Sequence, residues 1–464
     1  MPLRRLRPTV PGLLLPVALG AGLSLGVPTL KGAGSAPANA WIFPGPEQEW
    51  FGTAVDLDGD GVEELLMPSI DGPNVHGISP PTAVHVLKVE NQILVDRTTD
   101  FFTTIPMTWA VRRTVVGDFD GDGQRDVLFC GAGRETTDRS FLTLRPRVPG
   151  AWGEQNQVWL RRDGMFADAS ALFPQAAFYN HGCSIGDVDH SGHDSIMVNQ
   201  VGGAVAPFAP TFMASWDGAQ FSARTPFPLL TGTRTGKPWG FFTATGDYDR
   251  NGYADVVGDL EILWGTPTGP VVASLPPNAL VTPTFGNWQG EVTTDLNADG
   301  HPDLVKILST TPATGLDGAR FVMYTGGPNR TLTEKLDAFP ALQTYNDNDF
   351  GIDATVIDVN FDGFPDLVVF GPTYSSAADH RTASKSPNAV WLNDGTGRFT
   401  LAHFSDRLDT GSVCGGRGYR DMYFMKTADP MAYNVIIGGC YPGVAKTAYT
   451  VRTVTPDDPL TWLP

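Results

Sequence analysis

The chain has 464 residues, of which 50 are Asp or Glu and 32 are Lys or Arg, so its formal charge is −18. This acidic balance excludes the basic surface with which proteins bind nucleic acid, and it disfavours attraction to an anionic membrane. The hydrophobic fraction of 41% is enough for a folded core, and the 53 glycines and 38 prolines indicate frequent turns.

The first forty residues have the pattern of a secretory signal peptide. Arg4, Arg5 and Arg7 precede an apolar stretch, 10–27, and a small-residue run ends in Ala38-Asn39-Ala40. Prolines and glycines within the apolar stretch disfavour the alternative, a membrane-spanning anchor. We therefore expect 1–40 to be a signal peptide that is cleaved after Ala40. The remaining chain would be secreted, to the periplasm or the extracellular medium, with no membrane span.

Beyond residue 48, a nine-residue acidic pattern recurs six times, which indicates a repeating architecture. Its general form is Asp-x-Asp-x-Asp-Gly-x-x-Asp, with positions numbered 1 to 9. The copies, named loops 1 to 6 in chain order, are residues 56–64, 118–126, 187–195, 247–255, 295–303 and 358–366. A β-favouring stretch such as 114–117 precedes each copy and a short apolar run such as 127–129 follows it. Both flanks are therefore predicted to be strands.

Hairpin signals stand farther along these units. Asp-Gly turns lie within the β-favouring segments 158–166, 215–218 and 390–395. Four strands in each repeat of about 60 residues are typical of a propeller blade.

A seventh unit lacks the acids. Residues 423–425 and 434–438 match the flanking strands, Lys426 stands in place of the first Asp, and we expect a hairpin at 448–451. The sequence therefore predicts an all-β protein whose residues 41–464 form a seven-bladed β-propeller with four-stranded blades.

The loops offer oxygen ligands at positions 1, 3, 5 and 9. Calcium accepts about six to eight oxygens, and the Gly at position 6 permits the sharp turn that such a loop needs. An EF-hand is excluded because position 12 is never Glu. The predicted ligands are Asp56, Asp58, Asp60, Glu64, Asp118, Asp120, Asp122, Asp126, Asp187, Asp189, Ser191, Asp247, Asp249, Asn251, Asp255, Asp295, Asn297, Asp299, Asp303, Asp358, Asn360, Asp362 and Asp366.

The alternative is that these are Asp-rich turns without metal. Three or four carboxylates within nine residues would repel one another without a cation, and the coincidence occurs repeatedly. Loop 3 is a separate case, because Ser195 occupies position 9 and the acid has moved to Asp194. Metal binding by loop 3 and by the seventh unit stays open.

These loops, each preceded by a strand that carries a Phe-Gly-like dipeptide, resemble the FG-GAP/VCBS repeat family. Phe51-Gly52 and Phe350-Gly351 match the name-giving dipeptide. The chain is in this respect similar to the propeller of integrin α-subunits. The resemblance implies a seven-bladed propeller in which structural Ca²⁺ ions, five or six here, sit in loops that join the first and second strands of each blade.

With that loop placement, the start of a first strand and the end of a second strand share the opposite face of the ring. Cys130 and Cys183 would meet there, and so would Cys414 and Cys440. We expect these two disulfides, as an exported protein would permit. The alternative is that the cysteines are exposed reactive thiols.

The same face would gather aromatic and charged side chains around the central axis. Such a surface suits a ligand, because sugars stack on aromatic rings and Arg recognises carboxylates. The expected ligand-binding residues are Trp50, Arg113, His181, Trp239, Trp288, Tyr419 and Arg420. Packing between blades is the alternative for each aromatic.

The sequence leaves the function open among three classes. The first is a secreted, calcium-stabilised module that binds or adheres to a carbohydrate or an extracellular protein without catalysis. The second is a polysaccharide lyase or another carbohydrate-active enzyme, with Tyr179 or His181 as base and Arg113 or Arg420 neutralising a uronate. The third is a structural partner in a surface assembly. The oligomeric state has no signature in the sequence.

Overall fold

Strands make up most of the part of the chain that the computed structural model describes. That part comprises residues 40–42, 52–68, 81–108, 111–131, 154–174, 180–200, 211–224, 242–258, 261–276, 285–310, 320–340, 353–373, 384–404, 421–440 and 447–459. All of it belongs to one unit, Ala33–Thr461. The second unit, Met1–Gly32 with Trp462–Pro464, contains no described residue, so the expected signal peptide lies outside the description except for Ala40.

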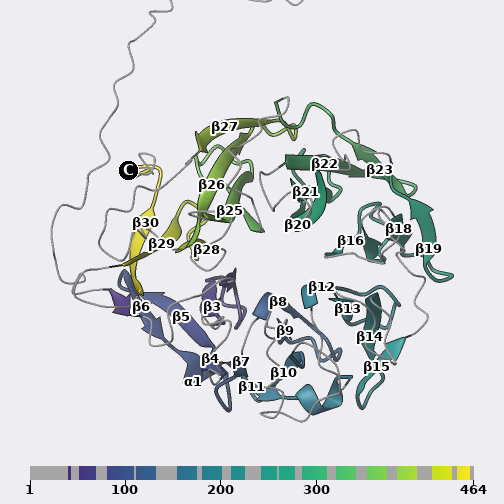
Figure 1. Ribbon diagram of the computed structural model, residues 1–464, viewed down its shortest axis with the longest axis horizontal. Coiled ribbons are helices and arrows are strands. Elements are labelled where there is room, and N and C mark those ends of the chain that lie inside the picture. Colours follow the sequence, from purple (N-terminus) through teal and green to yellow (C-terminus); the bar gives the residue numbers. More distant parts are fainter. Residues whose placement is uncertain are drawn as a thin grey trace, which may run out of the picture. The chain divides into compact units, whose positions relative to one another are not determined.

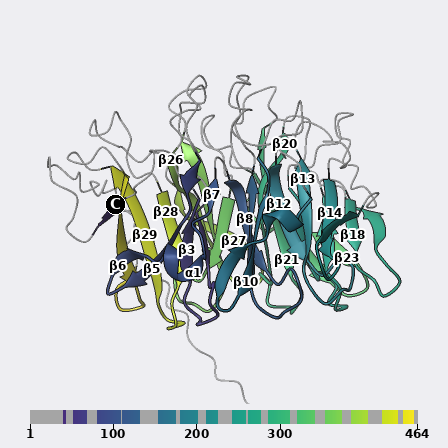
Figure 2. The same cartoon turned by 90° about the horizontal axis from the view of Figure 1, so that it is seen from below.

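Seven four-stranded antiparallel sheets form a ring, which confirms the predicted seven-bladed propeller (Figure 1). Blades 1 to 3 contain β2 (Thr53–Val55), β3 (Glu64–Met67), β5 (His85–Glu90) and β6 (Ile93–Asp96); β8 (Val111–Gly117), β9 (Asp126–Gly131), β10 (Gln157–Arg162) and β11 (Met165–Asp168); and β12 (Asn180–Gly186), β13 (Ser195–Gln200), β14 (Thr211–Trp216) and β15 (Phe221–Arg224). In Figure 2 the strands run from one face of the ring to the other.

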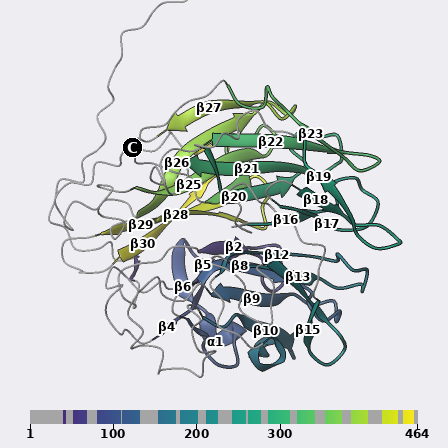
Figure 3. The same cartoon turned by 45° about the vertical axis from the view of Figure 1, so that its right-hand side comes forward.

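Blades 4 to 6 repeat the same order. They contain β16 (Ala244–Gly246), β17 (Asp255–Val257), β18 (Glu261–Trp264) and β19 (Val271–Ser274); β20 (Phe285–Thr294), β21 (Asp303–Thr310), β22 (Arg320–Gly327) and β23 (Thr331–Glu334); and β24 (Asp353–Ile357), β25 (Asp366–Thr373), β26 (Ser384–Asn393) and β27 (Phe399–Phe404). Figure 3 shows β20 to β23 side by side in blade 5.

Blade 7 combines the two ends of the described chain. It contains β28 (Asp421–Lys426), β29 (Tyr433–Cys440) and β30 (Thr447–Val454), and its fourth strand is β1 (Trp41–Ile42). Trp41 pairs with Tyr449, and Ile42 pairs with Ala448. The prediction of a hairpin at 448–451 is wrong, because these residues lie within the single strand β30, which pairs with β29 along its length.

The remaining elements are short. They are β4 (Thr82–Ala83), which pairs with β7 (Met107–Thr108), the helix α1 (Thr98–Phe101) and the 3₁₀ turn η2 (Ser170–Leu172). None of the helices within the described ranges has the length and apolar character that a membrane span requires.

The hydrophobic core lies between neighbouring blades. The cluster around Phe119 and Leu128 of blade 2 includes Ile196 and Phe212 of blade 3. Corresponding clusters join blades 1 and 2, 3 and 4, 4 and 5, 5 and 6, and 7 and 1. The second strands supply much of this core because runs such as Val127–Phe129 are apolar on both faces of the sheet. Each blade is therefore stabilised by its neighbours, which is why the ring has to close.

Candidate metal centre at the blade corners

The six acidic loops join the first and second strands of blades 1 to 6. Their backbones share one conformation: position 6 is always Gly, with φ between 79° and 93°. Position 4 also has positive φ, at Gly59, Gly121, His190, Arg250, Ala298 and Phe361. The non-glycine residues at position 4 keep φ at 54–60°, within the left-handed helical region, whereas the φ of 79–93° at position 6 favours Gly.

The aspartate at position 1 folds each loop around itself. One carboxylate oxygen accepts the N–H of the Gly at position 6, at 2.8–3.1 Å in all six loops. The side chain at position 2, such as Leu57, Phe119 or Tyr248, is fully buried between blades. The apolar side chain at position 2 therefore fixes the loop to the core, and the polar residues at positions 1 and 3 on either side of it remain in the loop.

The closing acid at position 9 is fully buried in five loops. These acids are Glu64, Asp126, Asp255, Asp303 and Asp366. One oxygen of each accepts the backbone N–H of position 2 at 2.8–3.0 Å. In the four loops closed by Asp, the other oxygen accepts an N–H at or just beyond the third strand, at 2.7–3.1 Å. The closing acid thus holds the loop to the blade behind it.

Burying these carboxyls makes their ionised form costly. Burial raises the pKa from the ordinary value of 3.8 to about 7 for Asp126, about 8 for Asp255, about 6 for Asp303 and about 7 for Asp366. Acids at the rim of the same loop add to the rise, while the two backbone N–H bonds oppose it. A nearby cation would reverse this, because positive charge favours the carboxylate.

Three loops bring carboxylate oxygens close enough to share one ion. In each set, one oxygen per residue lies within 4.8 Å of the others. The sets are Asp56, Asp58 and Glu64; Asp118, Asp120 and Asp122; and Asp247, Asp249 and Asp255. In loops 5 and 6 the third position is Asn297 or Asn360, whose amide donates to the Asp at position 5.

The donor set fits a hard divalent cation. Every predicted ligand offers oxygen, and no loop contains the sulfur ligand that softer metals select. Within the described residues, Oδ1 of Asp120 and Oδ1 of Asp295 are buried and accept no hydrogen bond. A buried carboxylate oxygen without a donor is costly, and a metal ion would satisfy it.

Loop 3 differs from the other five. Ser195 at position 9 bonds to Ser215, 2.7 Å away, and is fully buried. Asp194 turns towards blade 2, where its Oδ2 accepts the N–H of Asp118 at 3.1 Å. The acid of loop 3 therefore serves a contact between blades instead of closing its own corner.

Contacts between successive blades place the loops along one face of the ring. Arg125 of loop 2 donates to the carbonyl of Asp56 in loop 1. Asn393 of blade 6 donates to the carbonyl of Leu296 in loop 5. Lys426 of blade 7 exchanges hydrogen bonds with Glu63 of loop 1, so this belt of contacts also runs from the last blade to the first.

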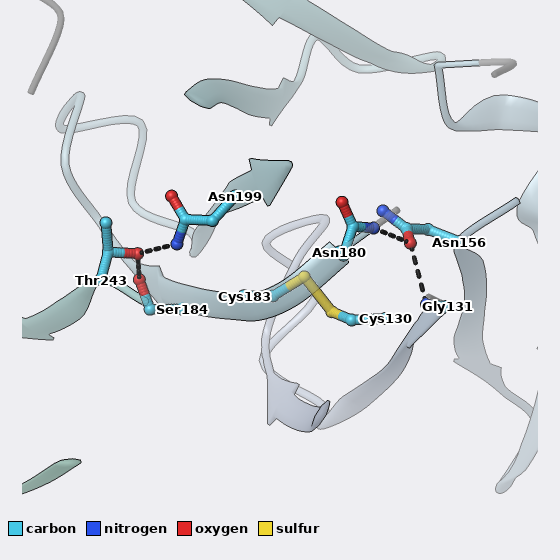
Figure 4. The surroundings of a disulfide bond; sticks show 8 residues. All are labelled: Cys130, Gly131, Asn156, Asn180, Cys183, Ser184, Asn199 and Thr243. Atoms are coloured by element: carbon cyan, nitrogen blue, oxygen red, sulfur yellow. Dashed lines mark hydrogen bonds between the residues drawn. A yellow bond between two sulfur atoms is a disulfide. The ribbon is translucent and has the colours of Figure 1, made fainter. Parts of the chain in front are cut away.

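A disulfide joins blades 2 and 3, as predicted, between Cys130 and Cys183, whose Cα atoms are 6.4 Å apart (Figure 4). Beside it, Asn156 Oδ1 accepts from Asn180 Nδ2 at 2.6 Å and from the N–H of Gly131 at 3.1 Å. Cys414 and the side chain of Cys440 lie outside the described residues, so the second predicted disulfide stays a prediction.

The predicted ligand face is described only in part. Trp50, Tyr179, Trp239, Tyr419, Arg420 and the side chain of His181 lie outside the described residues. Arg113 forms an ion pair with Glu291, Nη2 to Oε1 2.5 Å, in which Glu291 is nearly buried. Their strands, β8 and β20, belong to blades that are not neighbours, so the pair crosses the centre of the ring.

Trp288 is enclosed between blades 4 and 5. Only 1% of it is exposed, and its Nε1 donates to the carbonyl of Gly290 at 2.8 Å. The ammonium of Lys306 lies 4.0 Å from the ring centroid and donates to the carbonyl of Gly258. Both the ring face and the indole N–H are therefore used by the protein itself, which agrees with the packing alternative for this residue.

The sequence analysis missed two cations that reach the acidic loops from a third strand. Lys88 of β5 contacts Asp58, Asp60 and Glu64 of loop 1. Arg162 of β10 contacts Asp120 and Asp122 of loop 2. Each cation comes from the third strand of the blade whose loop it contacts. In the sequence, the only sign of such a contact is a basic residue within that third strand.

No protein-family model and no curated protein sequence matches the chain. Among solved structures it is similar to a chain of the S. cerevisiae core factor, with 10% identity and a TM-score of 0.43, covering 85% of this chain and 54% of that one. It is also similar to a protein of unknown function from Dyadobacter fermentans, with 11% identity, a TM-score of 0.42 and coverages of 89% and 97%. The V. cholerae biofilm matrix protein Bap1 follows with 12% identity, a TM-score of 0.32 and coverages of 88% and 68%.

The chain thus spans about half the length of the core factor chain. Likenesses this distant carry no argument about activity, ligand or partner. The propeller assignment rests on the seven four-stranded sheets themselves.

Proposed function

We propose that this protein is a calcium-binding β-propeller of the FG-GAP/VCBS type, exported from the cell, that acts as a non-catalytic binding or adhesion module for a carbohydrate or an extracellular protein. The observation that carries the calcium part is the set of closing acids. Five fully buried carboxyls stand next to further acids in the same loops. A divalent ion would stabilise their ionised form, whereas bare burial disfavours it.

Calcium suits these loops better than magnesium or zinc. Calcium accepts carboxylate, amide and carbonyl oxygens in flexible geometry, whereas magnesium demands a near-ideal octahedron and keeps several waters. Zinc prefers nitrogen and sulfur ligands, and none of the predicted ligands at positions 1, 3, 5 and 9 is His or Cys. In loops 1, 2, 4, 5 and 6, the residues at positions 1, 3, 5 and 9 would hold the ion, and it would supply positive charge to a corner of the blade.

The role of this ion would be structural. The same closing acids already bond to position 2 and to the third strand region, and position 2 is packed between blades. Fixing the charge at each corner would therefore stabilise the contacts between neighbouring blades. Export agrees with the Cys130–Cys183 disulfide, which persists in oxidising compartments.

Two of the residues predicted for the ligand face contact other parts of the protein itself. Arg113 is occupied by Glu291, and Trp288 is enclosed. Recognition would then fall to the other predicted residues of that face, Trp50, His181, Trp239, Tyr419 and Arg420.

The calcium proposal is tested by metal analysis and thermal melting. The mature chain, dialysed against calcium, should retain several ions per molecule, and exhaustive chelation should lower its Tm. A chain that holds no calcium and melts identically after chelation contradicts the proposal.

The binding proposal needs a separate screen. Immobilised glycans and matrix proteins should show saturable binding that falls after chelation, while uronic-acid polysaccharides should give no rise in ultraviolet absorbance. Such a rise would indicate the unsaturated product of a lyase and would contradict a non-catalytic module.

A further inference from the structure

Lys88 places a positive charge inside loop 1. It lies in β5, the third strand of blade 1, and its side chain is 22% exposed. The Nζ atom is 2.8 Å from Asp58 Oδ2, 2.8 Å from Glu64 Oε1 and 3.3 Å from Asp60 Oδ2. One ammonium thus contacts three of the four predicted ligands of this loop.

The contact with Glu64 distinguishes loop 1 from the other loops. In loops 2, 4, 5 and 6 the second oxygen of the closing acid accepts a backbone N–H. In loop 1 the corresponding oxygen, Glu64 Oε1, is paired with Lys88 instead. The ammonium therefore reaches the buried bottom of the loop as well as its rim.

Arg162 gives loop 2 a weaker version of this arrangement. Its guanidinium contacts Asp120 and Asp122, and its side chain is 43% exposed. No contact joins it to the closing acid, Asp126, whose two oxygens accept the N–H groups of Phe119 and Arg161. Arg162 is thus a cation at the rim, whereas Lys88 is a cation within the loop.

We propose that Lys88 is the resident cation of loop 1 and that a divalent ion enters this loop only by displacing the Lys88 ammonium. The proposal rests on the calcium binding proposed above. A tethered ammonium competes at a high effective concentration, whereas calcium has to bind from solution. Loop 1 therefore binds calcium more weakly than loops 2, 4, 5 and 6, and its corner keeps a positive charge when calcium is scarce.

The test compares Lys88→Met with Arg97→Met as a matched control. Arg97 directly follows β6, the fourth strand of blade 1, and its ion pairs are with Glu90 and Asp100, neither of which is a loop ligand. Both variants lose one positive charge. Calcium bound per chain is measured by equilibrium dialysis with metal analysis, over free calcium from nanomolar to millimolar, on the full mature chain.

Lys88→Met should bind calcium at one site at least tenfold more tightly than the original protein does, or gain one ion per chain. It should also lose more Tm in chelator than Arg97→Met does, and recover with calcium. Lys88→Gln, which keeps a polar end without charge, is measured in parallel so that poor folding of one variant does not decide the result.

Two outcomes separate the two proposals. If the original protein binds calcium and neither Lys88 variant changes its affinity or number of ions, the role of Lys88 is wrong and the calcium proposal stands. If none of the proteins binds calcium, the calcium proposal is wrong and the role of Lys88 falls with it. An equal gain in Arg97→Met would trace the effect to net charge and would also overturn the role of Lys88.

Discussion

The corners of blades 6 and 7 solve the same structural problem with different chemistry. In blade 6, Asp366 begins the second strand, is fully buried and accepts the N–H groups of Val359 and Asn393. In blade 7 the second strand begins with Tyr433, which is equally buried and donates its hydroxyl to the carbonyl of Val359 at 3.1 Å. The turn before it is closed by Thr427 and Asp429.

The difference shows that a blade corner does not need a buried acid. Blade 3 gives a second example, because its closing residue is Ser195. A neutral residue therefore suffices at the position that begins the second strand. The five buried acids carry a cost that the two neutral corners avoid, and a bound cation is the physical reason that would offset it.

Chelation combined with a change of pH should produce the largest effect. The closing aspartates have raised pKa values, about 8 for Asp255 and about 6 for Asp303, against 3.8 when exposed. Between pH 3.8 and each raised pKa, the folded protein keeps a proton on the closing acid that the unfolded chain releases. The stability of the metal-free protein therefore falls as the pH rises through this range. The Tm in chelator should therefore drop steadily from pH 5 to pH 8.

Calcium should weaken or reverse that slope, since it binds the ionised acids and competes with protons. The measurement is a set of thermal melts over this pH range, with calcium and with chelator. Parallel slopes in the two series would mean that no cation interacts with the closing acids, and the distinction between acidic and neutral corners would lose its basis.

Exchanging one closing acid should separate the two kinds of corner. Asp255→Asn leaves one oxygen for the N–H groups of Tyr248 and Gly265, which both bond to the carboxylate. With calcium present, we expect a loss of about 2–3 kcal/mol in the free energy of unfolding, the size of a hydrogen bond to a charged group. In chelator the loss should be smaller, because the raised pKa of Asp255, about 8, already favours its neutral form there.

Ser195→Ala is the matched change at a neutral corner. It removes the bonds to Ser215 and to Asp189, and its cost should be the same with calcium and with chelator. Urea unfolding of both variants in both conditions measures the difference. A calcium-dependent cost at Ser195 would place an ion in loop 3 and contradict the neutral interpretation of blade 3.

Tyr433→Phe should test the neutral corner of blade 7. It removes the bond to Val359 and keeps the ring, which stacks on Phe361 with centroids 5.5 Å apart. We expect a loss of about 1 kcal/mol, the usual net value of one hydrogen bond, independent of calcium. A loss that appears only with calcium would link Tyr433 to the ion of loop 6.

The sequence predicted the features that repeat. The spacing of the acidic loops and the apolar runs behind them were enough for the fold class, because each blade restates the same pattern. The closure of blade 7 by Trp41 and Ile42 was not predicted, since two residues carry no periodicity. The role of Lys88 and the ion pair between Arg113 and Glu291 were missed because the partners lie on other elements, and side-chain reach has no signature in sequence spacing.

Trp288 shows the opposite difficulty. The sequence placed it near the start of the first strand of blade 5, at the end away from the acidic loop, and the structure agrees. It could not tell whether the ring points to the axis or between blades, and the structure buries it against blade 4. An aromatic residue at a strand start is compatible with both until the neighbouring blade is known.

The smallest effect should come from position 4 of the loops, where acidic corners differ among themselves. Loop 5 has Ala298 there with φ 58°, and loop 1 has Gly59 with φ 80°. Holding a residue with a Cβ atom in this left-handed conformation destabilises the folded state by about 1–2 kcal/mol. Replacing it with Gly removes that cost, but Gly loses more backbone entropy on folding, which cancels part of the gain. Ala298→Gly should therefore stabilise the protein by about 0.5 kcal/mol. Gly59→Ala, whose added Cβ meets no atom within 4 Å, should destabilise it by about the same amount.

Denaturant unfolding of the two variants, with calcium present, should give shifts of opposite sign if the loops share one backbone conformation. Shifts of the same sign would show that loops 1 and 5 differ in backbone and that their acids present different ligand sets.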